Sequence, residues 1–383
     1  MIANLTPVTD LADSLKAARG SRGILRGVAI DRHGDRMTAT ATNMENVVTI
    51  TTAGDGGPDG WQLVGVEGDV GDFPRFKADT IASPTGAATI TYRDLRRLVT
   101  GVVPATDTET SRYALGGINV EVAEGGMLHA VATDGRRMHY ATVQPVAITG
   151  QAVALVGAST WATFDAVIRA TARKLLGHRT GLEKHLRGTD VVIAFGTDAG
   201  RGVVVMTWSD DATGTTVTIR ARLVEGRFPR WRDILAADAI NGPAVGFDGP
   251  SMVATMDDVQ KRHRAAWLEK RAAMVAAAST NREALRKARD FTMHRGATFG
   301  PAGVIACGFS WARSVPAAAA EVILDPRFVG DAVAAAVAFG DDEVDLRVAG
   351  DDASRSPVAI VVGGHRPGEA GPGFTAVIMP MAE

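Results

Sequence analysis

The sequence predicts an α+β fold made of antiparallel sheets and a few helices. Segments rich in Val, Ile and Thr with alternating apolar positions outnumber the segments with helical spacing. The two kinds of segment do not alternate regularly along the chain, which argues against a doubly wound parallel sheet. A strand–turn–strand pattern also occurs twice, so the architecture is expected to be modular and rich in β-structure.

The predicted elements follow from these patterns in chain order. Clusters of Gly, Pro and Asp mark breaks between elements at 53–60, 241–250 and 363–373. The predicted strands include 37–50, 118–122, 191–195, 202–208, 215–223 and 358–362. The predicted helices are 9–19, 92–101, 159–176, 256–291 and 325–339. Asp10 and Asp325 are expected N-caps, and Pro326 takes the first helical position, where its missing N–H costs nothing.

The repeat joins residues 24–45 with residues 114–136, allowing one gap. A Leu-x-Gly-Val motif in the first copy matches Leu-x-Gly-Ile in the second, and Ala-Thr-Asn matches Ala-Thr-Asp. Each copy indicates a strand, a tight turn with glycine, a second strand and a Thr-Asn or Thr-Asp turn that redirects the chain. Such a unit buries its apolar face only by packing against others of its kind.

Positive charge is concentrated in two segments, although the formal net charge is only −2. Residues 167–188 hold six basic residues and one acidic residue, and residues 256–291 hold nine basic and five acidic residues. The rest of the chain therefore carries a net charge of about −11. Two interpretations stay open: two solvated helix faces, or an acidic body whose basic helices meet a polyanion.

Composition argues against several classes of protein. A length of 383 residues allows two or three domains, and a single cysteine excludes a disulfide framework or a Cys-based metal site. No apolar run approaches the ~20 residues of a membrane span and the N-terminus lacks the order of a signal peptide, so a cytoplasmic location without membrane contact is expected. The histidines lack metal-ligand spacing, and no phosphate loop, dinucleotide fingerprint or nucleophile elbow occurs. No catalytic residue, metal or cofactor is therefore expected.

Four motifs occur in the order in which a known family has them. The first is DFP at 72–74, and the second is SRYALGG at 111–117 followed by VATDGRRM at 131–138. LVEGRFPRWRDIL spans 223–235, and the chain closes on AVIMPMAE at 376–383. Together these motifs resemble the bacterial DNA polymerase III beta subunit, the sliding clamp, of which the chain looks like a divergent member.

The resemblance implies a DNA-clamp fold, in which repeated units of antiparallel sheet and helix form a ring. It implies three domains, and the breaks in the sequence place them at about 1–82, 83–240 and 241–383. Members of the family are head-to-tail homodimers that encircle duplex DNA without reading its sequence. They tether a DNA polymerase, and the polymerase and the clamp loader bind through short peptide motifs. The ring itself has no catalytic residue, metal or cofactor.

The resemblance also implies contacts with duplex DNA. Basic side chains on or beside the helices that face the hole of a ring would hold phosphates loosely enough to permit sliding. The residues expected to contact DNA are Lys16, Arg19, Arg22, Arg96, Arg97, Arg112, Tyr113, Arg173 and Lys174. Ala114 stands where the family often has a second aromatic residue, so that contact is expected to be lost.

A hydrophobic cleft for partner peptides is the second implied site. Its wall is expected to consist of Leu115, Thr133, Gly135, Arg136, Arg137, Met138, Pro229, Ile234, Val377, Met379, Pro380 and Met381. Methionines are flexible and polarisable, which suits a groove that accepts varied apolar anchors. The IMPM segment by itself also fits a buried edge strand ended by proline. Asp233 replaces a usual basic residue and the tail ends Ala382-Glu383, so the preferred partner is expected to differ.

The N-terminal domain is expected to be shortened. Residues 1–82 hold one helix, the first copy of the repeat and a closing strand near 61–66, so ring closure is an open question. A long basic helical insertion near 256–291 enlarges the third domain. Three roles for this insertion stay open: part of the surface that faces DNA, a brace for the short domain, or a partner-binding element.

Three functions compete at this stage. The first is a DNA-encircling processivity clamp, and the second is a clamp-like peptide-binding regulator or decoy that forms no closed ring. The third is an enzyme on an unrelated α+β fold, which no set of residues in the sequence supports.

Overall fold

The computed structural model separates into two compact units. Unit 1 comprises Met1–Ala132 and Ala141–Pro229, and unit 2 comprises Thr133–Tyr140 and Arg230–Glu383. The three-domain division at residues 82 and 240 stays a prediction. The residues that the structure describes are 8–54, 56–75, 81, 84–108, 113–122, 126–176, 181–235, 244–278, 281–289, 296–300, 303–306, 309–311, 322–340, 342–348, 358–361 and 373–381.

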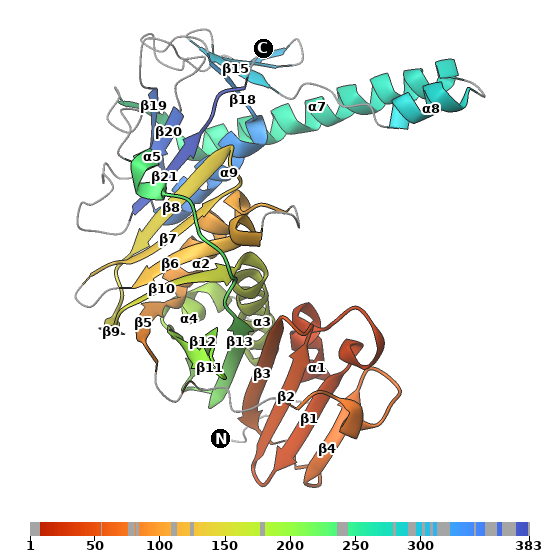
Figure 1. Ribbon diagram of the computed structural model, residues 1–383, viewed down its shortest axis with the longest axis vertical. Coiled ribbons are helices and arrows are strands. Elements are labelled where there is room, and N and C mark those ends of the chain that lie inside the picture. Colours follow the sequence, from red (N-terminus) through yellow and green to blue (C-terminus); the bar gives the residue numbers. More distant parts are fainter. Residues whose placement is uncertain are drawn as a thin grey trace. The chain divides into compact units, whose positions relative to one another are not determined.

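A nine-stranded antiparallel sheet forms the framework of unit 1 (Figure 1). Its strands, in spatial order, are β4 (Gly60–Val64), β1 (Val28–His33), β2 (Arg36–Thr42), β3 (Asn46–Ala53), β13 (Thr215–Arg222), β12 (Arg201–Asp210), β11 (Asp190–Asp198), β5 (Gly86–Thr91) and β9 (Ala147–Gly150). The sheet joins segments that are far apart in sequence, since Ile50 of β3 lies opposite Val217 of β13. Both side chains are fully buried, so strands from the first and the last part of the sequence of unit 1 contribute to one core.

Three further strands of unit 1 lie in the order β10-β6-β7. They are β10 (Ala152–Gly157), β6 (Gly117–Val122) and β7 (Leu128–Thr133), and both pairings are antiparallel. The strands predicted at 118–122, 191–195, 202–208 and 215–223 are confirmed as β6, β11, β12 and β13.

Four helices of unit 1 pack against one another. They are α1 (Val8–Ser14), which continues as a 3₁₀ turn to Ala18, α2 (Tyr92–Val102), α3 (Ala158–Leu176) and α4 (Leu182–Arg187). α2 begins at Tyr92 because Thr91 caps it, its hydroxyl accepting a hydrogen bond from the N–H of Asp94. The helices predicted at 92–101 and 159–176 are therefore confirmed within one residue. The prediction of Asp10 as an N-cap is wrong, because α1 begins at Val8 and places Asp10 in its first turn.

The sequence repeat is confirmed by matching hydrogen bonds in its turns. In the first copy the Thr42 hydroxyl donates to the Asn46 carbonyl, and the Asn43 side chain accepts from the N–H groups of Glu45 and Asn46. The second copy repeats these bonds, with Thr133 donating to Arg137 and Asp134 accepting from Arg136 and Arg137. Each turn also has one residue in the left-handed region, Met44 at φ 76° and Gly135 at φ 85°. The same short polar residues thus fix the same turn twice.

Unit 2 contains two sheets. The larger sheet has the order β8-β21-β20-β19-β14, and β8 is the strand through which the boundary between the units passes. These strands are β8 (Arg137–Val143), β21 (Gly373–Ile378), β20 (Val358–Val361), β19 (Glu343–Val348) and β14 (Ala244–Asp248). The smaller sheet has the order β17 (Phe309–Trp311), β16 (Gly303–Ala306), β15 (Ala297–Gly300) and β18 (Val322–Leu324). β20 confirms the strand predicted at 358–362.

The described residues of unit 2 form the helices α5 (Trp231–Leu235), α7 (Gly249–Ala278), α8 (Arg282–Arg289) and α9 (Pro326–Phe339). α9 confirms the helix predicted at 325–339, and Asp325 is its N-cap, accepting from the N–H of Arg327. α7 approaches α9 closely at Gly330, where an added Cβ would lie 3.3 Å from the Cβ of Met256. Glycine at this position allows the two helices to pack against each other.

Two predicted elements differ from the structure. The strand predicted at 37–50 is the hairpin β2–β3, because the Thr-Asn turn interrupts the apolar run. The helix predicted at 256–291 begins at Gly249 and is two helices, because Asn281 caps α8 by accepting from the N–H groups of Glu283 and Ala284. The sequence did not predict the earlier start, because Gly-Pro is typical of a turn. Proline is nevertheless accepted in the first turn of a helix, where the N–H that it lacks would have no partner within the helix.

Candidate functional site

The helices of unit 1 carry most of the residues expected to contact DNA, and several of these are held by acidic partners. The Arg96 Nη1 lies 2.5 Å from the Asp165 Oδ2, and this pair joins α2 to α3. The Tyr92 hydroxyl donates to the other oxygen of Asp165 at 2.7 Å. Arg97 pairs with Asp94 at 3.0 Å within α2, and both side chains are largely buried.

The first and third helices are joined in the same way. Lys174 Nζ lies 2.8 Å from Asp10 Oδ1 and 3.6 Å from Asp13 Oδ2, so α3 is tied to α1. The hydrogen bond with Asp10 raises the pKa of Lys174, which keeps the side chain charged. Arg19 donates to the carbonyl of Ala12. The charge of Lys174 is thus partly balanced by two carboxylates, and Arg19 is bonded to the backbone of α1. We call helices α1 to α4 the helical layer.

A buried polar cluster fixes Arg96 in place. Tyr92 is fully buried and Asp165 is 5 % exposed, so the phenol and the carboxylate satisfy each other away from water. Burial and the nearby carboxylate raise the pKa of Tyr92 far above its ordinary value. The hydroxyl therefore stays protonated and acts as a hydrogen-bond donor to Asp165.

The other expected DNA contacts divide into exposed and undescribed residues. Lys16, Arg22 and Arg173 are exposed and have no ion-pair partner among the residues that the structure describes. Arg112 lies outside the described residues, and Tyr113 is described only by its backbone in a 3₁₀ turn. The structure thus leaves three of the expected cations unengaged in unit 1.

The C-terminal Met-Pro-Met segment is anchored in unit 2 by two backbone hydrogen bonds. The N–H of Met379 donates to the carbonyl of Arg136 at 2.9 Å, and the N–H of Met381 donates to the carbonyl of Ile323 at 2.8 Å. The Thr133–Tyr140 segment, which belongs to unit 2, therefore lies beside the C-terminus. Residues from two of the family-like motifs are brought together here, although they are about 240 positions apart.

Arg137 ties the turn at Thr133–Arg137 to α9, and we call this turn the hairpin tip. Its Nη1 lies 2.5 Å from Asp331 Oδ2, its Nε lies 3.2 Å from Asp134 Oδ2, and its guanidinium lies 4.2 Å from the ring centre of Phe328. Only 9 % of the Arg137 side chain is exposed. Arg137 therefore has a structural role, because its charge is paired with two carboxylates of the same unit.

The predicted cleft residues differ in exposure. Thr133, Met138 and Val377 are buried; Arg137, Ile234, Pro380 and Met381 are half-buried; and Gly135, Arg136 and Met379 are exposed. Met379 is 46 % exposed, which is unusual for a methionine at the end of a buried strand. Leu115 and Pro229 belong to unit 1, where the first is half-buried and the second is exposed. Solvent in unit 2 thus reaches the hairpin tip and the Met-Pro-Met segment, while the buried members form part of the core.

Sequence reasoning missed the residues that support this surface. Asp331 and Phe328 lie on α9 and give no local sign of contact with a hairpin so far away in sequence. Trp231 of α5 stacks on Tyr140 of β8, with the ring centres 5.1 Å apart. The paired aromatic side chains place α5, which carries Ile234, beside the same hairpin. The one available signal was the tryptophan inside the LVEGRFPRWRDIL motif.

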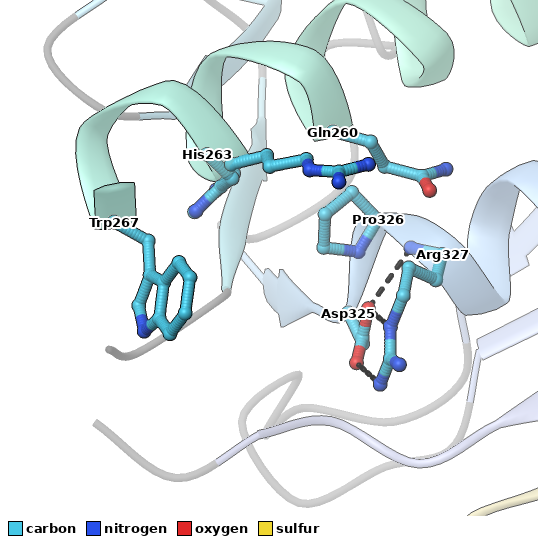
Figure 2. A pocket seen from close by; sticks show the side chains of 7 residues that line it. Gln260, His263, Trp267, Asp325, Pro326 and Arg327 are labelled. Atoms are coloured by element: carbon cyan, nitrogen blue, oxygen red, sulfur yellow. Dashed lines mark hydrogen bonds and ion pairs between the residues drawn. The ribbon is translucent and has the colours of Figure 1, made fainter. Parts of the chain in front are cut away.

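A pocket of about 290 Å³ lies between α7 and the start of α9 (Figure 2). Gln260, His263 and Trp267 of α7 line one side, and Asp325 and Arg327 line the other. Asp325 accepts a hydrogen bond from Arg327 Nη2 at 2.8 Å, which raises the pKa of Arg327. Its carboxylate is therefore engaged in capping α9 and holding a guanidinium.

None of the residues expected in the peptide cleft lines this pocket. Within the described part of the chain, no group of three His, Cys, Asp or Glu side chains is placed to hold a metal ion. In that same part of the chain, no helix combines the length and the apolar character that crossing a bilayer would require.

Comparisons with known proteins identify the fold. No model of a known protein family matches the sequence, and no curated protein matches it. Solved structures do match over nearly the whole chain. The DNA polymerase III beta chain of Streptococcus pneumoniae TIGR4 has a TM-score of 0.66 at 13 % identity, covering 98 % of this chain and 97 % of that one.

Two further structures agree. The DNA polymerase III beta subunit of Thermotoga maritima has a TM-score of 0.63 at 14 % identity and covers 98 % of both chains. The beta sliding clamp of C. crescentus has a TM-score of 0.61 at 19 % identity, covering 97 % of this chain and 95 % of that one. The fold that the motifs implied is thus confirmed by structures of low sequence identity. The chain has the α+β sliding-clamp fold of the DNA polymerase III beta subunits.

Proposed function

We propose that this protein is a DNA sliding clamp, a non-catalytic processivity factor that encircles duplex DNA and tethers a DNA polymerase. The observation that carries the proposal is the likeness of nearly the whole chain to the beta subunits of DNA polymerase III. Enclosure keeps a ring on DNA without strong contacts, so weak phosphate contacts are sufficient and permit sliding. The exposed cations Lys16, Arg22 and Arg173 of unit 1 are suited to such contacts.

The partner site in this proposal is the surface formed by the hairpin tip and the Met-Pro-Met segment. Met379 and Met381 supply adaptable apolar contacts, and the two backbone hydrogen bonds hold them in position. A polymerase or clamp loader would insert apolar side chains of a short peptide there. The residues of unit 1 expected at this cleft, Leu115 and Pro229, belong to the same proposal.

The ring in this proposal is a head-to-tail homodimer with a shortened first domain. Residues 1–82 contain α1 and the strands β1 to β4, and between β4 and β5 the described residues form only the 3₁₀ turn Val70–Asp72. This observation also favours a second function. A clamp-like regulator or decoy would keep the peptide site while forming no closed ring.

Oligomeric mass and retention on DNA distinguish the two functions. A clamp is expected to be a dimer at micromolar concentration and, once loaded, to stay on circular duplex DNA and slide off the same DNA after linearisation. Analytical ultracentrifugation and gel filtration with both DNA forms measure these properties. A strictly monomeric protein that leaves circular and linear DNA equally fast would overturn the clamp and support the regulator.

The peptide site is tested by removing its methionines. Deletion of residues 379–383, or the milder double substitution Met379→Ala and Met381→Ala, is expected to abolish binding of a polymerase-derived peptide. Met44→Ala is the matched control, because Met44 is 64 % exposed in the equivalent turn of the other repeat. Fluorescence anisotropy with a labelled peptide measures the affinity, and an unchanged affinity in the double variant would refute the assignment.

A further inference from the structure

A helical hairpin in unit 2 extends beyond the packed part of α7, and neither proposed site uses it. The first part of α7 packs on α9, with Met256 against Gly330, and Met252 and Val259 of the same part are also buried. Figure 1 shows the rest of α7 running outward, with α8 lying along its far end. We define the arm as residues 261–289, which include the second half of α7 and all of α8.

The arm is an ordered structure with its own contacts. Ala278 and Ala288 are buried, and the Arg271 Nε donates to the carbonyl of Ala288. The Arg271 guanidinium also lies 5.1 Å from the ring centre of Trp267. Because Arg271 of α7 bonds to the backbone of α8 and an alanine of each helix is buried, the arm presents its outer side chains on a defined framework.

The outer surface of the arm is strongly basic. Residues 261–289 contain nine basic and two acidic residues. Two exposed ion pairs link side chains four residues apart on one helix: Lys287 with Glu283 in the arm, and Arg262 with Asp258, which lies just before the arm. The exposed cations for which the described residues supply no acidic partner are Lys261, Arg264, Lys270, Arg282 and Arg286.

These exposed cations are distributed along the whole length of the arm, so an extended polyanion could meet several of them. At 3.6 residues per turn, Lys261 and Arg264 are neighbours on one side of α7 and Lys270 lies on the opposite side, and α8 adds Arg282 and Arg286, four residues apart on one face. The α7 part of the arm is about 27 Å long at ~1.5 Å per residue, the length of about eight base pairs of duplex. Binding there would release counterions from each neutralised phosphate.

An apolar partner is the competing interpretation. Leu268 is 50 % exposed and Val275 is 44 % exposed, and their seven-residue spacing places them on one face of α7. With Leu285 of α8, which is 36 % exposed, these are the large apolar side chains that the described part of the arm exposes, whereas exposed cations without an acidic partner among the described residues occur along the whole arm. The excess of charge therefore favours nucleic acid over a docked helix.

We propose that the arm binds the phosphate backbone of duplex DNA without reading its sequence. This inference rests on the proposed clamp function, because it adds a second DNA contact to a protein that encloses duplex. The arm supplies direct electrostatic affinity, whereas the ring supplies topological retention. The two properties are separable by experiment.

The test uses the full-length protein and a fluorescent linear duplex of about 20 base pairs, on which enclosure gives no retention. Anisotropy titrations at salt concentrations between about 50 and 200 mM measure both the affinity and its salt dependence. The arm variant carries Lys270→Gln, Arg282→Gln and Arg286→Gln. It is expected to lose affinity at least about tenfold at the low salt concentration and to flatten the log–log salt dependence by about 2.7, at ~0.9 per phosphate contact.

The matched control carries Leu268→Ser and Val275→Ser, which remove these apolar side chains of α7 and keep the charge. It is expected to bind the duplex like the wild type. Equal affinity and equal salt dependence of the wild type and the arm variant overturn the inference. Loss of duplex binding in the apolar control alone also overturns it and identifies the arm as a surface that acts through apolar contacts.

Circular-DNA retention of the same variants separates this inference from the proposed function. If the protein fails to stay on circular DNA while the arm variant alone loses duplex affinity, the clamp proposal fails and the arm still binds DNA. If circular retention holds while the arm variant binds duplex normally, the arm inference fails and the clamp stands. Circular dichroism and urea unfolding confirm that all variants are folded.

Discussion

The helical layer of unit 1 and the arm of unit 2 are both basic in sequence, but they use their charge in opposite ways. In the layer, three ion pairs join different helices, Arg96 to Asp165, Lys174 to Asp10 and Arg169 to Glu183, and one largely buried pair, Arg97 with Asp94, lies within α2. In and beside the arm, exposed ion pairs link side chains four residues apart on one helix, Arg262 with Asp258 and Lys287 with Glu283. A count of basic residues therefore overstates the charge that the layer offers to a ligand, and it is a better guide for the arm.

The two regions also differ in how they are stabilised. The layer contributes fully buried side chains, such as Trp161 and Phe164 of α3. The arm buries few side chains beyond Ala278 and Ala288, so its contribution to the core is small. Substitutions in the layer are therefore expected to lower the free energy of unfolding, whereas substitutions on the surface of the arm are expected to change DNA binding with little effect on stability.

The largest change in the free energy of unfolding is expected where α7 packs on α9, just before the arm. Met256 is fully buried against α9, so Met256→Ala leaves a cavity and should lower the free energy of unfolding by about 3 kcal/mol. Leu268→Ala, further along the same helix, should change it by less than about 0.5 kcal/mol. Urea unfolding measures both values, and equal losses would show that the arm is packed along its whole length.

A smaller loss is expected from breaking the ion pair that joins α2 to α3. Asp165→Ala removes the partner of Arg96 and leaves the buried Tyr92 hydroxyl without its acceptor, at a cost of about 2–3 kcal/mol. Glu283→Ala breaks an exposed pair in the arm and should cost about 0.5 kcal/mol or less. Similar costs for the two substitutions would contradict the contrast between the regions.

Removal of the Tyr92 hydroxyl is expected to have an intermediate effect that depends on pH. Tyr92→Phe should cost about 1–2 kcal/mol at neutral pH, because the buried carboxylate loses a hydrogen bond. The raised pKa of folded Tyr92 means that its stabilising contribution is complete below about pH 10 and is lost as the pH rises further, when the unfolded tyrosine ionises.

Unfolding curves of wild type and Tyr92→Phe between pH 7 and 11 measure this effect. Above pH 10 the advantage of the wild type should shrink by at most about 1.4 kcal/mol per pH unit. A difference that stays constant over the whole range would show that Tyr92 ionises equally in both states.

The smallest change in stability is expected for Arg286→Ala on α8. The side chain is exposed and has no acidic partner among the described residues, so the free energy of unfolding should stay within about 0.5 kcal/mol. The same substitution should weaken duplex binding, since it removes one unengaged cation. A large loss of stability would assign Arg286 a structural role and remove the contrast with Arg96.

Local patterns predicted many elements well and long-range contacts poorly. The bounds of α3 follow from apolar spacing, and the cap of α9 follows from Asp325-Pro326, because both depend on neighbours in sequence. The break before α8 escaped prediction because apolar and basic residues continue on both sides of Asn281. The ion pair between Arg137 and Asp331 was also not predicted, because local sequence patterns carry no information on a contact between residues 194 positions apart.

The sequence by itself determined the α+β class, the repeated turn and the resemblance to sliding clamps, since these depend on short motifs whose side chains act on their own backbone. Thr42 and Thr133, for example, form equivalent turn hydrogen bonds in both copies. Only the tertiary structure decided which basic residues are accessible. The charge of a side chain is set by its own chemistry, but its availability depends on which acids the fold places beside it.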